Sequence, residues 1–165
     1  MKRIQGDLLA LAKAGEFDMI VHGCNCFVTM GSGIARQIAD QFPQALAADK
    51  TTTISSYDKL GTYTMSSAEY NNGVINTSKL FTIVNAYTQY AFNRGRDKVD
   101  LFEYTSFAMI LQKLAHHYGH LRFGFPMIGM GLAGGNEVKI MSILSDFDEM
   151  VTVRGGSVTL VEFKI

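Results

Sequence analysis

The chain has 165 residues, of which 47% are hydrophobic and 18% charged, and its 15 basic and 15 acidic residues give a formal net charge of zero. This length and apolar content allow a sizeable core and exclude a disordered protein, while the balanced charge disfavours extended nucleic-acid binding. No apolar run is long enough to span a bilayer, and no apolar signal core follows Lys2 and Arg3, so we expect a cytoplasmic protein without membrane contact.

The chain shows no linker, internal repeat or low-complexity tract, and it contains only two prolines. We therefore expect one domain that spans residues 1–165, and a monomer, because no heptad pattern indicates a coiled coil. The two cysteines, Cys24 and Cys26, are too close in sequence for an ordinary structural disulfide, which is consistent with a reducing compartment.

In the first half of the chain, the sequence predicts strands that alternate with helices. The run FDMIVHG is continuously apolar, which is typical of a strand covered on both faces. Asp7 is placed to cap a short helix, and Pro43 is placed to end a longer one. The predicted elements are a strand over 3–5, a helix over 8–14, a strand over 17–23 and a helix over 32–42.

The second half continues this alternation. The run LFTIVNAY has the pattern of another buried strand, and the long helix that follows presents an apolar face with Phe107, Leu111 and Leu114. A turn at Asn71-Asn72-Gly73 joins two weaker strands. The predicted elements are strands over 62–69, 74–76 and 80–87, a helix over 100–118, a strand over 121–126, a helix over 136–150 and a strand over 157–163.

Strands that alternate with helices predict an α/β fold with a mixed, largely parallel sheet and helices on both faces. Ligands of such sheets bind beyond the carboxyl ends of the strands. We therefore expect the functional site in the segments that follow the strands ending near Gly23, Tyr87 and Pro126.

Two glycine-rich segments follow predicted strands, and each opens a predicted helix. The first is Gly31-Ser32-Gly33, and the second is the run GMGLAGG over 129–135. Small residues let backbone N–H groups approach an anion closely, and a helix N-terminus adds about half a positive charge. The two segments together predict a clamp for a diphosphate without Lys or Arg. The alternative is that each is only a tight strand-to-helix turn.

The run HGCNC, from His22 to Cys26, lies at the exit of a predicted buried strand. His22 could act as general acid, base or nucleophile, or it could be a core histidine with its hydrogen bonds satisfied. Asn25 could bind a sugar hydroxyl or stabilise a turn. His22, Cys24 and Cys26 alternate along an extended chain, which permits a metal site or a cysteine nucleophile. Because no fourth ligand follows at a metal-binding spacing, we expect no metal and no other cofactor.

Taken together, these motifs resemble those of the macrodomain family. The resemblance covers nearly the whole chain and rests on GDLLALAKAGEFDMIVHGCNC, GSGIARQIADQFPQA, IVNAYTQ and PMIGMGLAGGN. It implies a three-layer α/β/α domain with a mixed, largely parallel central sheet. It also implies a cleft above the sheet that binds ADP-ribose and its derivatives.

The resemblance assigns roles to individual residues. Asp7 would accept a hydrogen bond from the adenine amino group while also capping a helix, and Asn25 would contact the distal ribose. Phe163 would lie beside adenine, unless it belongs to the core. The implied substrate-binding residues are Asp7, Leu8, Asn25, Gly31, Ser32, Gly33, Ile34, Ala35, Gly129, Met130, Gly131, Leu132, Ala133 and Phe163.

The residues that end the second strand distinguish branches of this family. Most members carry Asn-Ala-Ala-Asn where this chain has the run HGCN. That variant is similar to the branch that hydrolyses the phosphomonoester of ADP-ribose 1″-phosphate with a His and an Asp. The resemblance therefore implies a phosphatase with His22 as general acid or nucleophile. Asp100, at the predicted start of the long helix, is the predicted acidic partner, and Asp97 is the alternative.

Other functions stay open. The same cleft would serve a non-catalytic ADP-ribose reader in which His22 is only a ribose contact. A de-ADP-ribosylase acting on protein or nucleic acid is another alternative, although the branch that releases ADP-ribose from glutamate uses an Asp near the position of Ala133. A redox or metal protein would instead use Cys24 and Cys26. The expected partner is a small molecule, either ADP-ribose or ADP-ribose 1″-phosphate.

Overall fold

The structure, a computed structural model, describes residues 1–71 and 78–163 of the chain. Its strands form one mixed sheet in the order β1-β6-β5-β2-β4-β3. The elements in chain order are β1 (Lys2–Gly6), α1 (Leu8–Lys13), β2 (Met19–Cys24), α2 (Gly33–Gln41), α3 (Pro43–Lys50), the 3-10 helix η1 (Tyr57–Lys59), β3 (Tyr63–Asn71), β4 (Ser78–Tyr87), α4 (Tyr104–Tyr118), β5 (Arg122–Phe125), α5 (Glu137–Thr152) and β6 (Ser157–Phe163).

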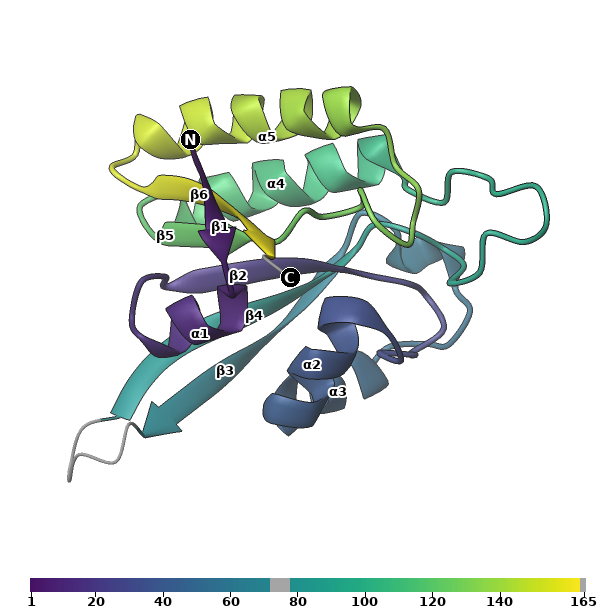
Figure 1. Ribbon diagram of the computed structural model, residues 1–165, viewed down its shortest axis with the longest axis horizontal. Helices are drawn as coiled ribbons and strands as arrows, with labels where there is room; N and C mark the ends of the chain where they lie inside the picture. The colour runs from purple at the N-terminus through teal and green to yellow at the C-terminus, as the bar shows by residue number, and fades with distance from the viewer. Residues whose placement is uncertain (72–77, 164–165) are drawn as a thin grey trace.

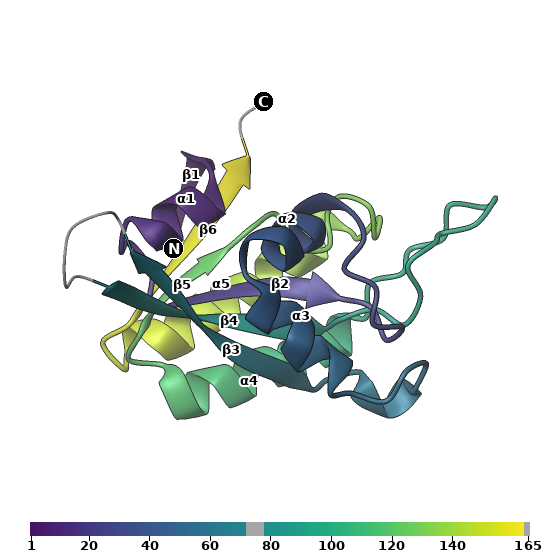
Figure 2. The same cartoon turned by 90° about the horizontal axis from the view of Figure 1, so that it is seen from below.

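Helices cover both faces of this sheet. α4 and α5 lie side by side on one face, and α1, α2 and α3 lie on the other (Figure 1). The view from below shows α2 and α3 beside β2, β3 and β4 (Figure 2). Among the described strands, only β3 runs antiparallel to its neighbour, which confirms the predicted α/β/α architecture with a largely parallel sheet. Among the described residues, no helix has both the length and the apolar character needed to cross a membrane.

The central strand β2 contributes side chains to two apolar cores, one on each face of the sheet. Val21 packs into the core beneath α4 and α5, and Ile20 packs into the core beneath α1 and α2. Both side chains are fully buried. Successive side chains of a strand point to opposite faces, so a strand covered on both faces must be apolar at every position. Burial on both faces therefore explains why the run FDMIVHG is continuously apolar.

The parallel strands bring distant segments together at one edge of the sheet. β2 pairs with β4 on one side and with β5 on the other, and all three run in the same direction. In this register His22 lies beside Asn85, and Cys24 lies beside Tyr87. The segments that follow β2, β4 and β5 therefore meet at the carboxyl edge, where ligands of such sheets bind.

One predicted helix boundary is wrong, and one helix was not predicted. The predicted helix over 32–42 is confirmed as α2, which ends at Gln41. The helix that was not predicted is α3, whose first residue is Pro43, a position that suits a ring with fixed φ and no N–H. The long helix α4 begins at Tyr104, because Asp100 Oδ1 accepts the N–H of Phe102 at 2.9 Å in a local turn that competes with helix formation. The predicted strand over 74–76 lies outside the described residues, as does most of the turn before it.

Candidate ligand-binding site

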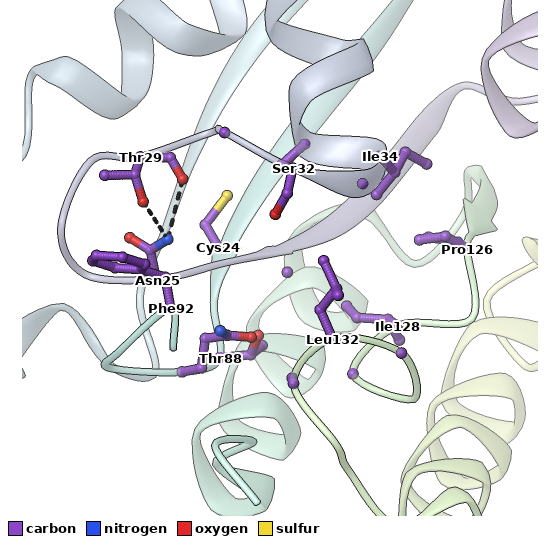
Figure 3. A pocket seen from close by; sticks show the side chains of 18 of the residues that line it. Cys24, Asn25, Thr29, Ser32, Ile34, Thr88, Phe92, Pro126, Ile128 and Leu132 are labelled. Carbon is purple, nitrogen blue, oxygen red and sulfur yellow. Dashed lines mark hydrogen bonds between the residues drawn. The ribbon is translucent and has the colours of Figure 1, made fainter. Parts of the chain in front are cut away.

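Two adjoining cavities lie at the carboxyl edge of the sheet. The first, of about 280 Å³, has both glycine-rich segments in its wall, and the second, of about 360 Å³, lies at the ends of β1 and β6. Both are lined by Ile34 and Met127, so they join end to end, and we call them together the cleft. Figure 3 shows Ser32 and Leu132 on opposite sides of the first cavity.

The first glycine-rich segment brings the N-terminus of α2 into the cleft. All five predicted residues of this segment, 31–35, line the first cavity. Ser32 occupies the N-cap position, but its side chain makes no capping hydrogen bond. The first N–H groups of the helix, from Gly33, Ile34 and Ala35, have no acceptor within the helix and are available to an anion.

The second glycine-rich segment supplies turn amides to the opposite wall. The N–H of Gly135 donates to the carbonyl of Gly129 at 2.7 Å and closes the loop. Within the described residues, the N–H groups of Gly131, Leu132 and Ala133 donate no hydrogen bond, and all three residues line the first cavity. Both glycine-rich segments thus contribute residues with unbonded N–H groups to the lining of the first cavity.

Two details of the second segment differ from the prediction. Its helix, α5, begins at Glu137 and is capped by Asn136, which accepts the N–H of Lys139 at 3.0 Å, and neither Asn136 nor Glu137 lines the cleft. Met130 lines neither cavity, because its side chain packs against the core beneath α4 and α5. Only the first segment therefore presents a helix N-terminus to the cleft.

The second cavity has an acidic group and an aromatic ring in its wall. Asp7 lines it together with Leu8, and Asp7 Oδ1 also accepts the N–H groups of Leu9 and Ala10 at 3.0 and 3.1 Å. The helix cap thus uses one carboxylate oxygen and leaves the other for a ligand. Phe163 also lines this cavity and is 60% exposed, so the interpretation of Phe163 as a core residue is wrong.

Asn25 lines the far end of the first cavity, but its amide is engaged in its own turn. Asn25 Nδ2 donates to the carbonyl of Thr29 at 3.1 Å and to Thr29 Oγ1 at 2.8 Å (Figure 3). Asn25 Oδ1 accepts the N–H of Phe27 at 2.8 Å. Both amide hydrogens are therefore used, and Asn25 has the turn-stabilising role that the sequence left open.

His22 lies behind the cleft wall and not in it. Its side chain is fully buried and lines neither cavity. Its Nε2 lies 2.6 Å from Oδ1 of Asn85, whose Nδ2 donates to the carbonyl of Ala45 at 2.9 Å. Asn85 Oδ1 must therefore accept, which places the imidazole proton on Nε2. Burial lowers the pKa of His22 to about 4, so the ring is neutral at physiological pH.

This histidine should make the stability of the protein depend on pH. As the pH falls below about 6.5, the unfolded chain binds a proton on His22, whereas the folded chain binds it only near pH 4. Stability is therefore full above pH 6.5 and is lost toward pH 4, by about 3 kcal/mol from this group. Urea unfolding at pH 7 and pH 4 should show this loss for the parent and not for His22→Gln. Parallel pH profiles for the two proteins would contradict the assignment.

Asp100 also lies outside the cleft. It lines neither cavity, and through Tyr104 it is linked to Asn136, the residue after the second glycine-rich segment. Tyr104 donates its hydroxyl hydrogen to Asp100 Oδ2, and the same hydroxyl oxygen accepts the N–H of Asn136 at 2.7 Å. The structure therefore does not bring His22 and Asp100 together around a ligand.

The first cavity contains only one titratable side chain among the described residues, that of Cys24. Burial raises the pKa of this thiol well above its ordinary value, and the nearby charge of Asp49 acts in the same direction. The thiol is therefore protonated and a poor nucleophile. In the described part of the chain, no group of three or more His, Cys, Asp or Glu side chains is placed to hold a metal ion.

Several lining residues were not among the predicted site residues. Thr88 and Gln89 follow β4 directly, and Phe92 lies a few residues further along. Gln37, on α2, lines the second cavity. The position of Thr88 and Gln89 after a buried strand was a usable signal, because the carboxyl ends of parallel strands form the ligand edge. Nothing in the local sequence marks Phe92 or Gln37.

Comparison with known proteins supports the structural assignment. No family model matches the chain. Over 159 residues it is 34% identical to an uncharacterized 17.5 kDa protein of the tk–vs intergenic region of Enterobacteria phage T4, and 93% of each chain is covered.

Solved structures share the fold. A macrodomain protein from Streptomyces coelicolor superposes with a TM-score of 0.63 at 23% identity, and 97% of each chain is covered. DarTG from Thermosipho africanus, in complex with ADP-ribose, gives 0.68 at 15% identity over 98% of this chain and 42% of that one. A Trypanosoma brucei macrodomain in complex with ADP gives 0.66 at 16% identity over 99% and 63%.

The mixed sheet, its helical layers and the cleft between two glycine-rich segments define the class, and the chain has the macrodomain fold. The 34% sequence identity with the phage protein, over nearly the full length of both chains, places the two proteins in one family. The chain thus belongs to the family of this phage protein and has the macrodomain fold.

Proposed function

We propose that this protein binds ADP-ribose, or ADP-ribose substituted on its distal ribose, in the cleft. The observation that carries the proposal is the order of groups along the cleft. An acid and an exposed aromatic ring line one end, two walls of free backbone amides lie in the middle, and a polar floor lies at the other end. This order matches a base, a diphosphate and a second sugar.

The electrostatics of the cleft suit a diphosphate held by backbone groups. Among the described residues, no Lys or Arg lines either cavity. Free amides of a helix N-terminus and of a tight loop can offset the negative charge at close range without desolvating a cationic side chain. The complexes of the Thermosipho protein with ADP-ribose and of the Trypanosoma protein with ADP support the same class of ligand.

The predicted hydrolysis of ADP-ribose 1″-phosphate stays a prediction, and the geometry favours binding over catalysis. General acid–base catalysis needs a titratable group within hydrogen-bond reach of the reacting atoms. His22 and Asp100 line neither cavity, and Cys24 is a protonated thiol. A phosphatase would therefore require His22 to leave Asn85 and enter the cleft, so a non-catalytic reader is the function that this geometry supports best.

Calorimetry with ADP-ribose tests this function. We expect one ADP-ribose to bind per chain, and ADP to bind more weakly because it lacks the distal sugar. We also expect phosphate release from ADP-ribose 1″-phosphate to stay at the rate of a blank. Absence of ADP-ribose binding would overturn the proposal. Phosphate release that disappears in His22→Gln, with ADP-ribose binding retained, would establish the phosphatase instead.

A further inference from the structure

The polar end of the first cavity offers few free hydrogen-bonding groups. Both amide hydrogens of Asn25 are used within its own turn, and Gln89 Nε2 donates to the carbonyl of Ala91 at 2.8 Å. His22 is turned away and is bonded to Asn85. A sugar that enters this end therefore finds its expected partners already engaged.

Thr88 is the exception. It follows the last residue of β4, lines the first cavity and is fully buried. Its hydroxyl oxygen has no hydrogen-bond partner among the described residues. The oxygen faces Gly23, also in the cavity wall: a Cβ added to Gly23 would lie 2.8 Å from it. Figure 3 shows Thr88 on the same side of the cavity as Asn25 and Phe92.

An unpartnered buried hydroxyl is unfavourable for the empty protein. Polar groups in protein interiors are nearly always paired, and one that is not has lost its water without gaining a partner. Valine has almost the same shape and would remove this penalty, so the hydroxyl adds nothing to the stability of the empty fold. It gains a favourable interaction only when something in the cavity bonds to it.

We propose that the Thr88 hydroxyl is a binding group for the sugar beyond the diphosphate and makes the cleft prefer ADP-ribose over ADP. This inference rests on the proposed function. A threonine side chain occupies discrete staggered positions, and a change between them turns the hydroxyl from Gly23 toward a ribose hydroxyl or ring oxygen. Thr88 is thus a specificity-determining contact at the polar end of the cleft.

Thr88→Val and Thr88→Ser, measured by calorimetry with ADP-ribose and with ADP, test this assignment. Thr88→Val loses one hydrogen bond to the ligand, so it should bind ADP-ribose about tenfold more weakly than the parent does. Its affinity for ADP should stay within about twofold of the parent's. Thr88→Ser keeps the hydroxyl and should keep most of the preference. The melting temperature of empty Thr88→Val should equal or exceed that of the parent, which a merely structural role would not produce.

Ser66 provides a matched control, because its hydroxyl is also buried without a partner among the described residues but lines neither cavity. Ser66→Ala should change neither dissociation constant. Equal weakening of ADP and ADP-ribose by Thr88→Val, or no weakening of either, would overturn the role of Thr88 while leaving the proposed function standing. A parent protein that binds neither nucleotide would overturn the proposed function and this inference with it.

Discussion

Gly131→Glu is expected to weaken ADP-ribose binding at least about a hundredfold without unfolding the protein. Gly131 lines the first cavity, and a Cβ added there meets no atom within 4 Å, so a side chain is tolerated by the fold. A carboxylate about 5 Å from a phosphate repels it by about 3 kcal/mol at the effective dielectric of a protein surface. The diphosphate would also lose close approach to the amides of this loop.

Gly131→Gln separates charge from bulk in this experiment. The glutamine side chain has nearly the same size as glutamate but no charge. Gly131→Gln should therefore lose only the affinity that is due to steric obstruction of the diphosphate. The difference between the two variants should shrink as salt is added, because exposed charges are screened. Both variants should melt within a few degrees of the parent. If Gly131→Glu bound ADP-ribose as tightly as the parent, the amide clamp would not be the diphosphate site.

Asn85→Ala is expected to lower the free energy of unfolding by about 4 kcal/mol, because it leaves buried polar partners unpaired and opens a cavity. The Asn85 side chain is fully buried. It bonds to His22 at 2.6 Å, to the carbonyl of Ala45 at 2.9 Å and to Thr64 Oγ1 at 3.1 Å. Asn85 thus ties β4 to β2, to α3 and to β3 at once.

Urea unfolding at pH 7 measures this effect, and ADP-ribose titration of the folded fraction measures its functional consequence. Asn85 lines neither cavity, so we expect the remaining folded protein to bind ADP-ribose with nearly the parent affinity. Ser66→Ala, which removes a hydroxyl with no partner among the described residues, should leave stability nearly unchanged. An Asn85→Ala protein as stable as the parent would show that the His22–Asn85 bond is not a structural support.

These two experiments address different parts of the same edge of the sheet. Gly131 lines the first cavity, whereas Asn85 and His22 are fully buried and line neither cavity. If His22 were a catalytic group, its ring would need both access to the ligand and a pKa near the working pH. Burial denies the first and lowers the pKa to about 4.

Most strands and helices, and the two glycine-rich segments that line the first cavity, could be predicted from the sequence, because they depend on local patterns. The buried strand ending at Cys24 appears as an unbroken apolar run, and the glycines of both segments mark where backbone can approach a ligand. The start of α4 was predicted less accurately. The N–H of Phe102 bonds to the Asp100 side chain, and this competing turn cannot be told from a helix cap by the local sequence.

The sequence by itself determined the layered α/β fold and the two walls of the cleft, because periodicity and glycine placement act over a few residues. Only the tertiary structure decided what His22 and Thr88 do. The partner of His22 lies 63 residues away, and the register between β2 and β4 selects it. That register ties His22 to Asn85, and no local pattern indicates this pairing of distant residues. Within the part of the chain that the structure describes, the hydroxyl of Thr88 at the cavity wall has no partner.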